Sequence, residues 1–162
     1  GLGGTVTTSD LAQFEEVLRT NVAGALALMQ KAGLTLAEAQ KQRFPEKAAD
    51  IVVIGSVVGR NISPFSAVYG ASKFAVHALA EGLRREVGPR GVRVTLIEPG
   101  IVASGFQAVA GYSDAQLKGF DDNFGPLLVP EDVANAIGYT VAQPPHVAVC
   151  DIVLRPTRQE YP

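Results

Sequence analysis

The stretch Ile51-Val52-Val53-Ile54-Gly55-Ser56 decides the fold class. Its four apolar residues are all β-branched and leave no polar position, so both faces of the segment must be covered by other parts of the protein. Strands with one face in water alternate apolar and polar residues, whereas strands of parallel sheets are apolar throughout. The run therefore predicts a strand of a parallel sheet, and the glycine and serine that follow begin a loop.

Segments with helical apolar spacing and two more apolar runs surround this strand along the chain. Asp10 stands where it can cap the first helix, and Gly33 stands where that helix can end. The expected helices lie at 10–32, 34–43, 66–87 and 130–141. The two further strands are expected at 92–97 and 147–154. This alternation of helices and strands predicts an α/β fold whose parallel strands are joined by right-handed crossovers.

Composition limits the classes of partner and location. The chain has 162 residues, which is the length of one domain, and its formal net charge of −2 gives no reason to expect nucleic acid or an anionic membrane as a partner. No apolar run reaches the ~18 residues of a membrane span, and the first ten residues do not resemble a signal peptide. Cys150 is the only cysteine, which excludes an internal disulfide and favours a reducing, cytoplasmic location. His77 and His146 lack ligand spacing, so no metal site is expected.

Three side chains with proton-transfer chemistry are placed where they could meet. Tyr69 and Lys73 are four residues apart on an expected helix and so share one face, and Ser56 follows the carboxyl end of a strand, where open α/β sheets bind ligands. A tyrosine hydroxyl titrates at about pH 10, and a neighbouring ammonium favours its ionised form. A serine hydroxyl nearby could hydrogen-bond a substrate oxygen. Taken alone, the spacing fits a surface tyrosine beside a solvated lysine equally well.

Four short motifs occur in one order along the chain. They are Asn21-Val22-Ala23-Gly24, Ile54-Gly55-Ser56-Val57-Val58-Gly59, Tyr69-Gly70-Ala71-Ser72-Lys73 and Glu98-Pro99-Gly100-Ile101-Val102. Each motif alone is weak, but together they resemble the short-chain dehydrogenase/reductase family, over about residues 10–154. The resemblance implies a Rossmann-like, doubly wound parallel sheet. It also implies an oxidoreductase that transfers hydride between NAD or NADP and an alcohol or carbonyl substrate.

The resemblance further implies a role for each motif residue. Tyr69 matches the general acid/base, and Lys73 matches the residue that lowers the pKa of the tyrosine and holds the nicotinamide ribose. Ser56 matches the residue that orients and polarises the substrate oxygen, and Asn21 matches the asparagine that supports a water-linked proton path. The residues implied to bind the cofactor are Tyr69, Lys73, Pro99, Gly100, Ile101, Val102 and Ser104. Ser104 stands where the family more often has threonine, and it keeps the hydroxyl.

Each of these residues also has an ordinary structural explanation. Asn21 could bond a neighbouring backbone group, Ser56 could cap a turn, and Pro99-Gly100 could simply open a loop. Residues 101–129 are expected to be irregular, and a loop of this length is usually functional or mobile. Its aromatic side chains, which either line a substrate pocket or anchor the loop to the core, are Phe106, Tyr112, Phe120 and Phe124. Residues 155–162 are expected to form a polar tail.

The glycine-rich turn with which the family binds the cofactor pyrophosphate has no clear counterpart in the sequence. Gly1-Leu2-Gly3-Gly4 is glycine-rich, but no apolar strand precedes it. The chain is therefore expected to be the truncated, C-terminal part of a family member, with 1–162 forming a single partial Rossmann-like domain. The choice between NAD and NADP stays open, because the residues that make it in the family belong to the missing part.

Association with other copies is a further expectation from the resemblance. In the family, the helices that align with 10–32 and 66–87 form a dimer interface, which implies a homo-oligomer, either a dimer or a tetramer. The small residues on these helices also fit ordinary packing against a sheet. A second function therefore remains open, namely a non-catalytic, truncated family member that acts through dimerisation or by binding another subunit.

Overall fold

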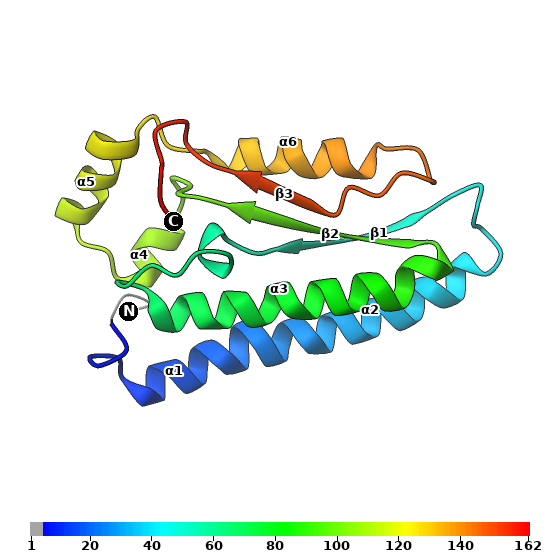
Figure 1. Ribbon diagram of the computed structural model, residues 1–162, viewed down its shortest axis with the longest axis horizontal. Helices are drawn as coiled ribbons and strands as arrows, with labels where there is room; N and C mark the ends of the chain where they lie inside the picture. The colour runs from blue at the N-terminus through cyan, green and yellow to red at the C-terminus, as the bar shows by residue number, and fades with distance from the viewer. Residues whose placement is uncertain (1–4) are drawn as a thin grey trace.

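Parallel strands form the centre of the fold (Figure 1). The computed structural model describes residues 5–162, apart from the side chains at 108 and 109. Within this part, three strands lie in the order β1 (Ala49–Ile54), β2 (Val92–Pro99) and β3 (Asp151–Leu154). Both neighbouring pairs are parallel, so the expected α/β fold with a parallel sheet is confirmed. Gly1-Leu2-Gly3-Gly4 lies outside the described residues.

Helices cover both faces of the sheet. The helical segments in the described part are, in chain order, α1 (Leu11–Val17), η1 (Leu18–Gly24), α2 (Ala25–Gln40), η2 (Val57–Gly59), α3 (Ala67–Val87), η3 (Gly88–Arg90), α4 (Phe106–Ala110), α5 (Asp114–Phe124) and α6 (Pro130–Val141). Figure 1 shows α2 and α3 on one side of the sheet and α6 on the other. None of these helices has an apolar stretch long enough to cross a membrane.

The first helical region is continuous where a break was expected. Asp10 caps α1 as expected, because its carboxylate accepts a hydrogen bond at 2.9 Å from the N–H two residues on. Gly33, expected at a helix end, is buried within α2, and a Cβ at this position would lie 2.9 Å from Leu83 Cδ1. The glycine therefore allows α2 to approach α3 closely. The helix ends at Gln40 rather than at Arg43.

Two helices occupy part of the segment 101–129, which was expected to be irregular. Helix α5 begins with a capping box, in which the Ser113 hydroxyl accepts from the Gln116 N–H at 3.3 Å and the Gln116 side chain accepts from the Ser113 N–H at 2.9 Å. Gly119 and Asp121 have low helix propensity, so the composition of this segment does not indicate a helix. The expectation of a wholly irregular segment is therefore wrong.

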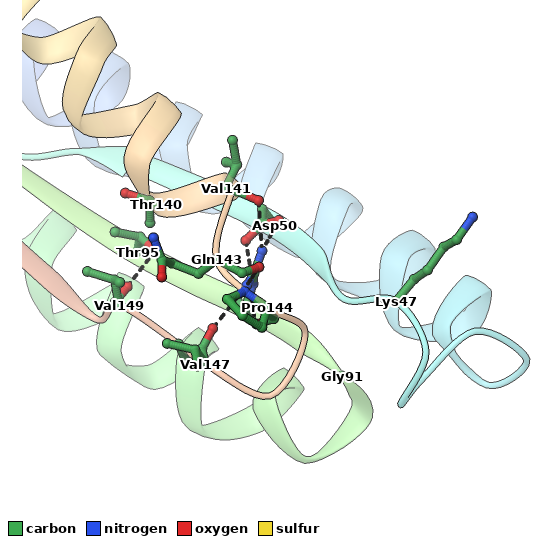
Figure 2. Close-up of polar contacts among 12 residues, drawn as sticks. Lys47, Asp50, Gly91, Thr95, Thr140, Val141, Gln143, Pro144, Val147 and Val149 are labelled. Atoms are coloured by element: carbon green, nitrogen blue, oxygen red, sulfur yellow. Dashed lines mark hydrogen bonds and ion pairs between the residues drawn. The ribbon is translucent and has the colours of Figure 1, made fainter.

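Strand β3 is shorter than the expected strand at 147–154. Two carbonyl groups before β3, those of Val147 and Val149, accept hydrogen bonds from side chains of β2, and Figure 2 shows the bond from Thr95 to Val149. Arg93 Nη1 donates to Val147 O at 2.9 Å, and Thr95 Oγ1 donates to Val149 O at 2.6 Å. These two bonds connect the segment before β3 to β2, and the backbone bonds to β2 begin at the Cys150 carbonyl, which accepts from the Leu96 N–H at 2.8 Å.

Arg93 joins three parts of the fold. The residue is 8% exposed, and its guanidinium bonds both carboxylate oxygens of Asp50, on the neighbouring strand β1, at 2.8 Å each. The same side chain donates to carbonyl groups at the end of α6 and in the loop that leads to β3, those of Val141, Gln143, Pro144 and Val147 (Figure 2). The buried cation is thus paired and hydrogen-bonded, which offsets its cost of burial.

The carboxyl ends of all three strands lie at the same edge of the sheet. Figure 1 shows this edge facing α4 and α5, with the N-terminal end of α3 and the short helix η2 beside it. In open α/β sheets ligands bind outside the carboxyl ends of the strands. The fold thus brings the loops after β1 and β2 to the place where a binding site is expected.

Candidate active site

A cavity of about 1050 Å³ opens at the carboxyl edge of the sheet. Ser56, Tyr69 and Lys73 all line it, although they come from two elements, the loop after β1 and the first two turns of α3. The loop at 99–102 and Ser104, which follow β2, line the same cavity. The structure therefore brings together every residue expected to bind the cofactor and three of the four expected catalytic residues.

The side chains of Ser56 and Tyr69 lie close enough for the Ser56 hydroxyl to lower the pKa of the Tyr69 phenol. Ser56 caps η2 as well, because its Oγ accepts from the Val58 N–H at 3.4 Å. Burial raises the pKa of Tyr69 to about 12, the Ser56 hydroxyl opposes this shift, and Tyr112 adds to it. The phenol is therefore neutral at neutral pH, and the lowered pKa that the resemblance implies is not seen for Tyr69 in this structure.

Lys73 lies one helical turn beyond Tyr69. Its Nζ donates to the Ile54 carbonyl at 3.2 Å, at the end of β1, and lies 5.7 Å from the centre of the Tyr69 ring. Burial lowers the pKa of Lys73, because the apolar surroundings disfavour the charged ammonium. The ammonium is thus placed beside the tyrosine and oriented by a backbone carbonyl.

Asn21 lies behind α3 and does not line the cavity. It is part of η1, a π-helical turn, and π-bulges are frequent at functional sites. Its Nδ2 donates to Ser72 Oγ at 3.1 Å, and this hydroxyl donates to the Tyr69 carbonyl at 2.7 Å. Asn21 therefore supports the backbone of the Tyr69 turn from outside, instead of bonding a backbone group of its own helix.

The aromatic residues of the segment 101–129 face the cavity. Phe106, Tyr112, Phe120 and Phe124 all belong to its lining. The Phe106 ring lies 5.9 Å from that of Tyr69, and Tyr112 and Phe120 meet edge to face at 5.4 Å. They pack against one another as well, so one arrangement forms the pocket wall and holds the helices α4 and α5 in place.

The C-terminal residues also reach the cavity, where a polar tail was expected. Gln159 and Pro162 line it, and the Tyr161 hydroxyl donates to the Ile62 carbonyl. Gln159 is 5% exposed, and its Oε1 accepts from the Ile101 N–H at 3.0 Å. Its Nε2 is buried and has no partner within the described residues. No local pattern could predict this contact, because it joins positions 58 residues apart.

A buried carboxylate on β2 is a second feature that the sequence reasoning missed. Glu98 is 0% exposed and is bonded by Arg60 Nε at 2.9 Å and Nη2 at 2.5 Å. The available signal was an acidic residue directly after the apolar pair Leu96-Ile97, since carboxylates are rarely buried unless they are paired. Elsewhere in the described part, no group of three His, Cys, Asp or Glu side chains is placed to hold a metal ion.

The chain is similar to known oxidoreductases over nearly all of its length. An uncharacterized oxidoreductase of Staphylococcus aureus strain MW2 is 30% identical over 155 residues, which are 96% of this chain and 60% of that protein. Serine dehydrogenase from Escherichia coli is 26% identical and superposes with a TM-score of 0.77, covering 98% of this chain and 61% of the other. A closed form of serine dehydrogenase complexed with NADP+ gives a TM-score of 0.84 at 26% identity, covering 99% and 63%.

The family assignment rests on a match to most of the chain. The sequence profile of the short chain dehydrogenases matches residues 1–113, which include the motifs that contain Asn21, Ser56, Tyr69 and Lys73. The chain spans about three fifths of the length of the curated relatives that it matches. The order of the strands, the motif residues around one cavity and this profile agree, and the chain belongs to the short chain dehydrogenase family.

Proposed function

We propose that the chain is an NAD(P)-dependent oxidoreductase that interconverts an alcohol and a carbonyl compound, with Tyr69 exchanging the proton. The observation that carries this proposal is the presence of the Ser56 and Tyr69 side chains in the wall of one cavity, with the Lys73 ammonium 5.7 Å from the centre of the Tyr69 ring. A substrate oxygen within reach of both hydroxyl groups would be held by one and protonated by the other.

The neutral state of Tyr69 suits the direction of carbonyl reduction. A phenol whose pKa is about 12 holds its proton at neutral pH and can donate it to a substrate oxygen that gains negative charge. The Ser56 hydroxyl can stabilise the same developing charge. After the transfer, the nearby Lys73 ammonium and the Ser56 hydroxyl would both favour the phenolate that remains.

The residues after β2 that line the cavity fit the nicotinamide end of a dinucleotide. The loop at 99–102 and Ser104 line the same cavity as Tyr69 and Lys73. The buried Nε2 of Gln159, whose Oε1 accepts from the Ile101 N–H, is a donor without a partner among the described residues. When bound, the cofactor supplies or accepts the hydride, which no protein side chain can do. Support for this class of cofactor comes from the serine dehydrogenase neighbour, whose structure contains NADP+. NAD and NADP both remain compatible with these residues.

The charge of the cavity favours an uncharged substrate. Lys73 is the one charged side chain among the described residues that line it, and its ammonium is already bonded to Ile54. A substrate carboxylate needs a cationic partner to leave water at low cost, and no second cation is present in this wall. The aromatic side chains of α4 and α5 suit an apolar body instead.

We therefore expect NADPH or NADH oxidation, followed at 340 nm, with uncharged aldehydes or ketones at a kcat/KM at least about tenfold above that for 2-oxo acids of equal size. Ser56→Ala should lower this rate by about 10²-fold or more, since it removes a donor to the reacting oxygen. Ser63→Ala, at another hydroxyl of the cavity wall, is the matched control and should leave the rate within about threefold. Equal rates for Ser56→Ala and the unaltered chain would refute the proposed role.

The pH titration of Tyr69 follows from its surroundings. Because burial favours the neutral phenol, we expect Tyr69 to ionise at about pH 12, above the usual value of 10.0. The contribution of Tyr69 to the free energy of unfolding should be fully present below pH 10.0. It should fall between pH 10.0 and about 12, because in this range the unfolded chain has lost the phenol proton and the folded chain has kept it. Ultraviolet absorbance of tyrosinate, taken as the difference between the unaltered chain and Tyr69→Phe, measures it. A midpoint at or below 10.0 would contradict the structure.

A second candidate function is association without catalysis, through the helices at 10–32 and 66–87. The observation that favours it is exposed apolar surface on α2, where Leu26, Leu28 and Leu34 are 49%, 74% and 58% exposed. Burying them against a second copy would remove apolar surface from water. We expect light scattering to give at least twice the monomer mass of 17.0 kDa. Leu28→Glu should shift the population from the oligomer toward the monomer. A monomer at all concentrations, or a Leu28→Glu variant with unchanged mass, would exclude this surface.

A further inference from the structure

The third turn of α3 also reaches the loop that holds Ser56. His77 lies four residues after Lys73, as Lys73 does after Tyr69, so the three side chains project from one face of the helix. His77 Nε2 accepts a hydrogen bond from the backbone N–H of Ser56 at 3.2 Å. Successive turns of α3 therefore place Tyr69 beside the Ser56 hydroxyl, bond Lys73 to the Ile54 carbonyl and bond His77 to the Ser56 N–H. The end of β1 is held at three adjacent points.

The ring of His77 is itself held from the other side. Its Nδ1 lies 3.7 Å from Glu98 Oε2, and this carboxylate is fully buried and clamped by the Arg60 guanidinium. Because Nε2 accepts from Ser56, a neutral His77 must have its proton on Nδ1, which is the nitrogen that faces Glu98. The arrangement connects a fixed carboxylate on β2, through one imidazole, to the backbone of Ser56.

The loop that contains Ser56 leaves space for the imidazole ring of His77. Gly55 directly precedes Ser56, and Gly59 is the last residue of η2. A Cβ at either position would overlap the imidazole of His77. Neither glycine has a positive φ, so their backbone conformation does not require them. The space for the ring does require them, which makes the fit between His77 and the Ser56 loop specific.

We propose that His77 is a positioning residue for Ser56, and that Glu98 and Arg60 fix the orientation and tautomer of its ring. His77 does not line the main cavity and so does not touch the substrate. It acts by placing the Ser56 N–H and, with it, the hydroxyl that lies beside Tyr69. The catalytic part of this inference rests on the proposed function, whereas the contact itself can be tested without turnover.

The surroundings of His77 keep it neutral, the only state in which Nε2 can accept. Burial lowers the pKa of His77, Glu98 and Asp151 oppose this, and the cations Lys73 and Arg60 add to it. A folded pKa below 6.5 means that the unfolded chain binds a proton first, so the contribution of this contact to stability is complete above pH 6.5 and is lost below it. A protonated Nε2 is a donor, and the Ser56 N–H then loses its acceptor.

Three variants at two histidines test the proposal. His77→Gln keeps an acceptor oxygen near the place of Nε2, His77→Leu removes it, and His146→Gln, at the exposed second histidine, is the matched control. For His77→Leu we expect kcat to fall about tenfold, with the KM for NADPH changed less than about twofold, because Ser56 acts on the reacting oxygen. His77→Gln should regain kcat to within about threefold of the unaltered chain.

The second readout is the amide resonance of Ser56 in a proton–nitrogen correlation spectrum. In the unaltered chain it should move upfield on acidification below pH 6.5 as the bond to His77 is lost, and in His77→Gln this titration should disappear. This measurement needs neither turnover nor the leucine variant, so it separates a failure of the proposed function from a failure of the inference. A Ser56 resonance without a His77-dependent titration, or equal kcat values for His77→Leu and the unaltered chain, would overturn the proposal.

Discussion

Tyr69→Phe should lower kcat by about 10²–10⁴-fold, the usual contribution of a positioned general acid. The hydroxyl that is removed lies beside Ser56 in the cavity wall, whereas the ring, whose centre is 5.9 Å from that of Phe106, is retained. The loss should therefore be one of chemistry, with little change in the KM for NADPH or in the urea midpoint of unfolding. The measurement is NADPH oxidation by the full chain, beside circular dichroism.

The matched control for this substitution is Tyr139→Phe. Tyr139 lies on α6 and is 60% exposed, so its hydroxyl has no part in the cavity. We expect its rate to stay within about twofold of the unaltered chain. If Tyr69→Phe retained more than about a third of the activity, Tyr69 could not be the group that exchanges the proton.

Arg93→Met should destabilise the fold by about 3–5 kcal/mol, which is a large share of the ~5–15 kcal/mol that stabilises a domain. Methionine resembles the apolar stem of arginine but lacks the guanidinium, so the substitution leaves the Asp50 carboxylate without its partner. The carbonyl groups at the end of α6 and before β3 lose their donor at the same time. Urea unfolding followed by circular dichroism gives the free energy of unfolding directly.

Arg85→Met provides the comparison at the surface. The Arg85 side chain is 75% exposed and bonds Glu81 on the same helix, and such pairs contribute about 0–1 kcal/mol. We expect its free energy of unfolding to differ from that of the unaltered chain by less than about 1 kcal/mol. A similarly small effect for Arg93→Met would mean that this buried cluster does not hold α6 and β3 to the sheet.

The strands and the centre of the site could be predicted because local patterns specify them. A wholly β-branched run such as 51–54 fits only a covered strand, and the spacing of Tyr69 and Lys73 fixes their common helix face. The carboxyl ends of parallel strands always meet at one edge, which places Ser56 near that face. These inferences need only periodicity and topology, and the structure confirms the parallel strand and the shared cavity, whereas β1 is only partly covered, with Val53 buried and Ile54 44% exposed.

The parts that escaped prediction depend on contacts between distant residues. Helix α5 contains a glycine and several acids, so its capping box and its packing define it more than its composition does. The segment before β3 is connected to β2 by the side chains of Arg93 and Thr95, and no local pattern at 147–154 reveals these contacts. Gln159 bonds the loop at Ile101, which lies 58 residues earlier in the chain. His77 bonds the Ser56 N–H from the third turn of α3. Both side chains gain a role only from the tertiary fold.

The central claim is that the wall formed by the loop after β2 receives the nicotinamide end of NAD(P) in the cavity that Tyr69 lines. The most direct measurement follows the amide resonances of Gly100, Ile101 and Ser104 while NADPH is added to the full chain. The account predicts saturable shifts at these three amides, with no comparable change at Gly138 on the far helix α6. Shifts confined to α6, or none at the loop up to saturating NADPH, would contradict it.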